Sequence, residues 1–168
     1  MSLSKREYIS KRFKELGITS HDMAMIVINE QEKYNPGLTF DQVNNAIESI
    51  ISKREIQHAL VTALSIDELA DKKQLPEPFQ FMIEEDNPLY GVDEAIAIVS
   101  SLMYGTISNS NWGYLDKSKP GIVGYLNDLQ KKANGHVTTM TDDMISMIIA
   151  GAEAKVSHNN RHEESDGE

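Results

Sequence analysis

Residues 142–152 read Asp-Asp-Met-Ile-Ser-Met-Ile-Ile-Ala-Gly-Ala, two adjacent acids followed by a run that is apolar on nearly every helical face. A second stretch has the same pattern, since Asp93 and Glu94 precede the largely apolar run Ala95–Met103. Helices that are apolar all round belong in a protein core. The two stretches therefore predict an all-α fold with two buried central helices.

Helical signals continue over most of the remaining chain. Ser4-x-x-Glu7 and Ser65-x-x-Glu68 are capping boxes, and the Asn35-Pro36-Gly37 turn ends a helix. No alternating apolar and polar run of strand length occurs. The expected helices cover residues 4–16, 20–34, 39–64, 65–73, 78–85, 88–104, a segment from Ser118 onward, and a last helix from Thr139 or Thr141 to about Val156, with a loop over 105–117. We expect a single-domain bundle of about seven to eight helices over residues 1–156, and a disordered polar tail over 157–168.

Composition excludes several classes of protein. The chain has 168 residues, a net charge of −10 and no cysteine, so disulfides, cysteine zinc sites and thiol nucleophiles are excluded. The acidity argues against a nucleic-acid binder, which needs a basic surface. The longest uncharged stretch, Ala95–Leu115, contains several serines and asparagines and does not suit a membrane span. We expect a cytoplasmic protein.

The negative charge belongs to the body of the chain. The first 16 residues carry a net charge of +3 and the last 12 carry −3, which leaves −10 for residues 17–156. A single acid in a first helical turn is explained by the helix dipole. Two adjacent carboxylates at the edge of a core repel each other, and two such pairs at one end of a bundle would form a hard-cation site. Asp93, Glu94, Asp142 and Asp143 are the candidate ligands, and Mg²⁺ is the candidate ion.

Two further positions suggest anion binding. Arg54 interrupts an apolar stripe, and a buried guanidinium either pairs with an acid, reaches solvent along its stem or binds a phosphate. The segment from Asp116 to Lys119 combines an acid, two lysines and a predicted helix start. It is either an anion site or an ordinary capped turn exposed to solvent.

Three of these segments, in this order, resemble the phosphatidylglycerophosphatase A family. The first is Leu-Tyr-Gly-Val-Asp-Glu at residues 89–94, and the second is Leu-Asp-Lys-Ser-Lys-Pro-Gly-Ile at 115–122. The third is Asp142-Asp143 with Ala150-Gly151. Residues 52–57, 104–106 and 113–117 are similar to a small soluble branch of that family.

The resemblance implies a bacterial enzyme of phospholipid metabolism, a Mg²⁺-dependent phosphatase acting on phosphatidylglycerophosphate or a related phosphomonoester. It assigns metal binding or catalysis to the four carboxylates of the two acid pairs. The residues that would contact the substrate phosphate are Arg54, Asp116, Lys117 and Lys119.

The chain also departs from the family pattern. Typical members are integral membrane proteins, so a lipid substrate would here be met at the inner membrane surface. The basic first helix, with Ile9, Phe13 and Leu16 on one side, either lies on anionic lipid or packs on its own domain. Asn127 stands where an acid is usual, which leaves open a non-catalytic phosphate-binding or regulatory protein. A helical nucleoside-triphosphate pyrophosphohydrolase ranks last because no Glu-x-x-Glu occurs. The composition also permits a homo-oligomer.

Overall fold

The computed structural model describes residues 3–165, with side chains up to residue 158, and every regular element in that range is a helix. The prediction of an all-α, single-domain bundle is confirmed, with nine helices in the described part of the chain. They are α1 (Lys5–Glu15), α2 (Ser20–Gln31), α3 (Phe40–Ile51), α4 (Arg54–Asp71), α5 (Phe79–Glu84), α6 (Val92–Leu102), α7 (Gly105–Ser118), α8 (Gly121–Leu129) and α9 (Thr141–Ser165). Within residues 3–165, none is both long and apolar enough to cross a bilayer.

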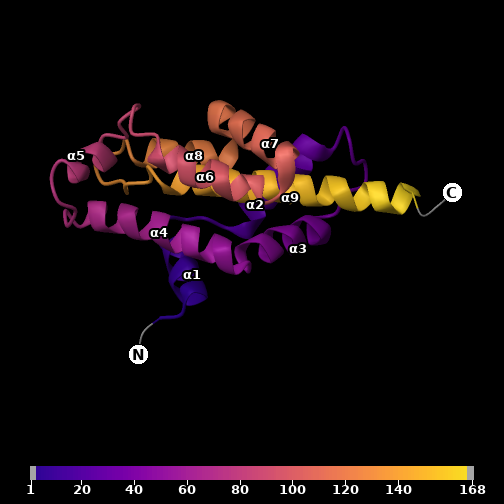
Figure 1. Ribbon diagram of the computed structural model, residues 1–168, viewed down its shortest axis with the longest axis horizontal. Helices are drawn as coiled ribbons and strands as arrows, with labels where there is room; N and C mark the ends of the chain where they lie inside the picture. The colour runs from indigo at the N-terminus through magenta and orange to yellow at the C-terminus, as the bar shows by residue number, and fades with distance from the viewer. Residues whose placement is uncertain (1–2, 166–168) are drawn as a thin grey trace.

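Helix α9 forms the centre of the molecule and lies along its longest axis (Figure 1). It contacts α2, α3, α4, α6, α7 and α8, and its apolar residues from Met144 to Ala152 are fully buried. Gly151 allows the closest approach, because a Cβ there would lie 3.0 Å from Ile50 Cδ1 and 3.2 Å from Tyr104 Cδ2. The first stretch quoted above is therefore a core helix, as predicted.

Helix α6 packs beside α9 but is only half buried, which corrects the expectation of two fully buried central helices. Ala97 and Ser101 face the core, whereas Val99 is 67% exposed. The two helices are parallel. Asp93 at the start of α6 and Asp142 at the start of α9 line one cavity, and Tyr104, just past the end of α6, lies near Gly151, which is further along α9. Both acid pairs therefore lie at the same end of the bundle.

Several element boundaries differ from the predicted ones. The helix expected over 39–64 breaks at Ser52 and Lys53, and α4 then runs through Ser65 to Asp71. Ser65 caps no helix and donates a hydrogen bond to the Tyr8 hydroxyl. Helix α9 continues to Ser165, nine residues past the predicted end, and residues 166–168 of the predicted tail lie outside the described residues.

The predicted loop over 105–117 is wrong, because these residues form α7. Its serines, asparagines and glycines are weak helix formers. However, Ser108, Trp112 and Leu115 form a buried stripe at helical spacing, and α7 packs along α9. Burial of this stripe against α9 overrides the local preference for a loop.

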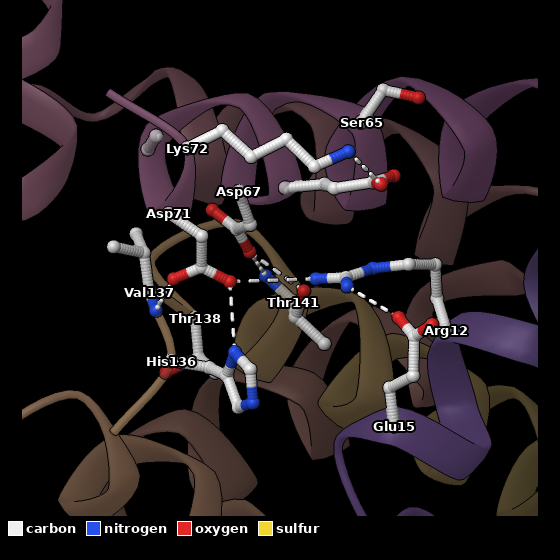
Figure 2. Close-up of polar contacts among 12 residues, drawn as sticks. Arg12, Glu15, Ser65, Asp67, Asp71, Lys72, His136, Val137, Thr138 and Thr141 are labelled. Carbon is white, nitrogen blue, oxygen red and sulfur yellow. Dashed lines mark hydrogen bonds and ion pairs between the residues drawn. The ribbon is translucent and has the colours of Figure 1, made fainter. Parts of the chain in front are cut away.

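Helix α1 packs on α4 and buries Ile9, Phe13 and Leu16, so its apolar side is covered by its own domain. Arg12 is buried with them, and its guanidinium pairs with Glu15 at 2.6 Å and with Asp71 at 3.6 Å. Asp71 also accepts hydrogen bonds from His136 Nδ1 and from the Val137 amide (Figure 2). One carboxylate thus joins α1, α4 and the segment that leads into α9.

A second carboxylate of α4 fixes the start of α9. Asp67 is fully buried, and its oxygens accept hydrogen bonds from the amides of Met140 and Thr141 and from the Thr141 hydroxyl, the last at 2.6 Å (Figure 2). Burial raises the pKa of Asp67, and these donors offset part of that rise. Amides at a helix start need acceptors. Asp67 supplies one from α4, in addition to the local Thr138 carbonyl oxygen, which accepts from the amides of Thr141 and Asp142.

Replacement of Asp67 by alanine is expected to lower the free energy of unfolding by about 3 kcal/mol, because three buried donors lose their acceptor. Chemical denaturation measures this loss. Asp41→Ala, an exposed acid in the first turn of α3, is the control and should change stability by less than about 0.5 kcal/mol. Equal effects of the two variants would show that Asp67 does not anchor α9.

A third buried carboxylate, Glu153 on α9, is incompletely paired. Its Oε2 accepts a hydrogen bond from Asn111 Nδ2 at 2.7 Å, while its Oε1 has no hydrogen-bond partner among the described residues. Burial raises the pKa of Glu153 to about 8, and the Asn111 hydrogen bond opposes that rise. The folded protein therefore holds this proton more tightly than the unfolded chain does.

A raised carboxyl pKa stabilises the fold below the unfolded value and loses this effect as the pH rises through about 8. We expect Glu153→Gln to be more stable than the wild type by roughly 2–4 kcal/mol at pH 9 and nearly equal to it at pH 5. Denaturation at the two pH values measures the difference. The exposed Glu32→Gln should show no such pH dependence, and the same absence in Glu153→Gln would contradict the prediction.

Candidate functional site

The two acid pairs line one polar cavity of about 270 Å³. Its walls come from the start of α6, the end of α7, the start of α9, Asn127 of α8 and the segment before α6. The six acids among the lining residues are Asp86, Asp93, Glu94, Asp116, Asp142 and Asp143. The lining also contains one cationic side chain, Lys119, so the cavity concentrates negative charge at one end of the bundle.

Lys119 links two of these acids. Its Nζ lies 2.6 Å from Asp116 Oδ1 and 2.9 Å from Asp142 Oδ2. Burial alone would lower the pKa of Lys119, but the two carboxylates raise it overall, so the ammonium stays charged. The residue has a left-handed backbone (φ 47°) between α7 and Pro120, and a Cβ on Gly124 would lie 2.4 Å from its carbonyl oxygen. Only glycine at 124 therefore fits against this backbone.

The acid pair of α9 is strongly destabilised in its charged form. Burial raises the pKa of both Asp142 and Asp143; Lys119 opposes the rise at Asp142, and the Asp142 charge adds to it at Asp143. Trp112 Nε1 donates a hydrogen bond to the Asp143 carbonyl oxygen at 3.2 Å and holds this turn against α7. Among the residues that line the cavity, the two adjacent carboxylates of this buried turn therefore have only the Lys119 ammonium group to balance their negative charge.

The acid pair of α6 faces the same cavity. Burial raises the pKa of Asp93 and of Glu94, and neighbouring acids raise each further. Asp93 Oδ1 is buried and has no hydrogen-bond partner among the described residues. An unpartnered buried carboxylate oxygen needs a cation, a proton or a donor from a ligand.

The donor set suits a hard divalent cation. Carboxylate oxygens are the ligands that Mg²⁺ prefers, and a bound cation would relieve the repulsion that raises these pKa values. As the side chains stand, no three acidic or histidine side chains of the described residues already enclose a position for an ion. Lys119 occupies the space between Asp116 and Asp142, so the carboxylates would have to adjust around a bound cation.

The structure brings together most of the residues singled out from the sequence, but not all. Asp93, Glu94, Asp116, Lys119, Asp142 and Asp143 line the cavity. The two others lie elsewhere.

Arg54 begins α4, at the end opposite to Asp67, and is therefore about 20 Å along the helix axis from the acidic end. Its side chain is 78% exposed, and Glu55 lies 3.7 Å from it. The apolar stripe that placed Arg54 in the core assumed one continuous helix, whereas the break at Ser52 turns the side chain outward. Lys117 is exposed and does not line the cavity.

Asp86 and Asn87 line the cavity although the sequence did not single them out. Asp86 has a left-handed backbone (φ 48°), and its charge raises the pKa of Asp93 and of Asp142. In the sequence Asp86-Asn87-Pro88 resembles any polar turn. The one signal in the sequence was its place, as the last of three consecutive acids (residues 84–86) that precede the α6 acid pair by seven residues. Asn127 reaches the cavity from α8, at the position where the resemblance expects an acid.

Comparison with known proteins identifies a family for this chain. The family model described as phosphatidylglycerophosphatase A matches residues 24–158, which include every acid of the cavity. The chain is 42% identical to the uncharacterised protein YutG of Bacillus subtilis over 153 residues, which cover 91% of this chain and 90% of that protein. It is 40% identical to YpjQ of the same species, over 91% of this chain and 82% of that protein.

Solved structures show the same fold. The low temperature requirement C protein of Listeria monocytogenes superposes with a TM-score of 0.86 at 35% identity, over 96% of this chain and 99% of that one. A Bacillus stearothermophilus protein of unknown function superposes with a TM-score of 0.85 at 38% identity, over 95% and 96%. Because the family model matches more than half of this chain, the chain belongs to the phosphatidylglycerophosphatase A family.

Proposed function

We propose that this protein is a Mg²⁺-dependent phosphatase that hydrolyses phosphatidylglycerophosphate or a related phosphomonoester. The observation that carries the proposal is the cavity in which acid pairs from two parallel helices meet with too little positive charge to balance them. Family membership favours phosphomonoester hydrolysis over other uses of such a cluster. The residue roles below belong to this proposal.

Asp93, Glu94, Asp142 and Asp143 are the residues that would hold the ion, with Asp86 beside them. When bound, Mg²⁺ would supply positive charge that offsets the charge of the transferring phosphoryl group. The unpartnered Asp93 Oδ1 is the oxygen whose burial is hardest to explain without a cation. A carboxylate of the cluster that keeps a free oxygen would accept the proton of the attacking water.

Lys119 would contribute the second positive charge. Its ammonium group already lies within hydrogen-bond distance of Asp116 and Asp142, so its position is set before any ligand arrives. With Asp142 among the residues that would hold the ion, Lys119 would be able to donate to a phosphate oxygen. Asp116 would then orient the ammonium group rather than contact the phosphate.

A non-catalytic phosphate-binding protein is the alternative that the structure keeps open. Asn127 places an amide where the resemblance expects an acid, which removes one candidate ligand or base. Such a protein would be stabilised by Mg²⁺ and a phosphate ester without turning the ester over. The two functions therefore differ in whether phosphate is released from the ester, and not in whether the ester binds.

The test is phosphate release from phosphatidylglycerophosphate and from a panel of soluble phosphate monoesters, with Mg²⁺ or with a chelator. We expect turnover only with Mg²⁺, and losses of about 100-fold or more in Asp93→Asn and Lys119→Met. Lys117→Met, two residues from Lys119 but outside the cavity, is the matched control and should keep wild-type activity.

Circular dichroism and thermal denaturation of each variant would confirm that the fold is intact. Ligand-dependent stabilisation without phosphate release from any ester would favour the binding protein. Wild-type turnover in both Asp93→Asn and Lys119→Met would contradict the assignment of this cavity as the active site.

A further inference from the structure

One side of α6 is an apolar surface that no part of the described chain covers. Val92, Ala95, Val99, Leu102 and Met103 follow one another at helical spacing, and all five are exposed; we call this surface the α6 face. Val99 and Leu102 have 67% and 51% of their surface exposed. Isolated exposed apolar residues are ordinary, but a continuous helical stripe of them marks an interaction surface.

The neighbourhood of the α6 face is unusual for so acidic a protein. No charged residue occurs from Ala95 to Leu115, a stretch that includes most of α6 and most of α7, and these two helices pack side by side. Tyr114 on α7 adds an exposed aromatic ring. An uncharged surface of this kind can be buried against apolar material without stranding a charge.

The two ends of the α6 face differ in charge. At its start, Val92 precedes Asp93 and Glu94, and the segment that carries Leu89, which is 94% exposed, also forms a wall of the acidic cavity. At its other end, Lys53 Nζ lies 5.3 Å from the ring centroid of Tyr104, next to the exposed Arg54. Glu55 lies 3.7 Å from Arg54, so the apolar surface runs from the rim of the cavity to a cluster of two cations and one acid that keeps a net positive charge.

We propose that the α6 face docks on a phospholipid bilayer, with Lys53 and Arg54 against anionic headgroups. The inference rests on the proposed function, because the acyl chains of a lipid whose phosphate enters the cavity must leave it over apolar surface. The α6 face begins at that rim. The α6 face, and not the apolar side of α1, is therefore the surface that contacts lipid in this proposal, because the apolar side of α1 is buried against α4.

A bilayer explains the combination of features better than a second copy of the chain does. An apolar helix face alone would suit either occupant. Continuity with the cavity rim is required only for a lipid, and exposed cations beside apolar side chains are typical of proteins that bind anionic membrane surfaces. Self-association is therefore the competing outcome of the test.

The test is sedimentation of the full chain with vesicles of phosphatidylcholine, with and without phosphatidylglycerol, in the presence of Mg²⁺. We expect binding that increases with the anionic lipid and falls about tenfold or more in the double variant Val99→Glu/Leu102→Glu. Tyr34→Glu replaces a side chain that lies outside the α6 face and is even more exposed than Val99; it is the control and should bind as the wild type does. Lys53→Gln/Arg54→Gln should lose only the dependence on anionic lipid.

Activity separates this inference from the proposed function. The Val99→Glu/Leu102→Glu variant should hydrolyse a soluble phosphate ester normally while losing activity on the same headgroup in vesicles. Vesicle binding without hydrolysis of any ester would support the α6 face and contradict the proposed function. Hydrolysis without vesicle binding would overturn the docking of the α6 face on lipid and leave the proposed function intact. If no form binds vesicles and the double variant instead changes the molecular mass measured by sedimentation equilibrium, the docking on lipid is likewise overturned, in favour of self-association.

Discussion

The hydrogen bonds between Asp67 and the first turn of α9 are the contact on which the rest of the structure depends. A helix start buried in the core cannot leave its amides unpaired, and the Asp67 carboxylate of α4 accepts from the amides of Met140 and Thr141 at the start of α9. This contact fixes where α9 begins, and therefore where Asp142 and Asp143 lie. Asp71, one turn further along α4, similarly joins α1 and the segment before α9. Two carboxylates of one helix thus hold the acidic end of the bundle together.

The candidate site places like charges together where water cannot screen them well. Six acids line the cavity, one lysine lies among them, and burial raises the pKa of the most enclosed carboxyls. Such an arrangement costs stability unless a ligand relieves it. A divalent cation would relieve it most simply, and a phosphate ester could then approach an otherwise acidic cavity. The account of function rests on this electrostatic imbalance, with family membership supplying the class of reaction.

The helix starts that carry the acid pairs were predictable because their signal is local. An acid pair followed by an apolar run requires only that the run be helical and partly buried. Other features depended on contacts between distant segments. Residues 105–117 become helical because Trp112 and Leu115 are buried against α9, a contact that outweighs the segment's many weak helix formers and is not visible from the segment alone. Arg54 looked like a core position only until a break at Ser52 divided the stripe it belonged to. Asp86 joins the site through a turn whose sequence is typical of any surface loop.

The most direct test of the central claim is to locate the ion. Crystals of the full chain soaked in Mn²⁺, a stand-in for Mg²⁺ with a measurable anomalous signal, would show where a divalent cation binds. The account predicts an anomalous peak in the acidic cavity, bonded to carboxylate oxygens of both α6 and α9. A cavity without a peak, with Mn²⁺ bound elsewhere or not at all, would contradict the claim that the two acid pairs form a cation site.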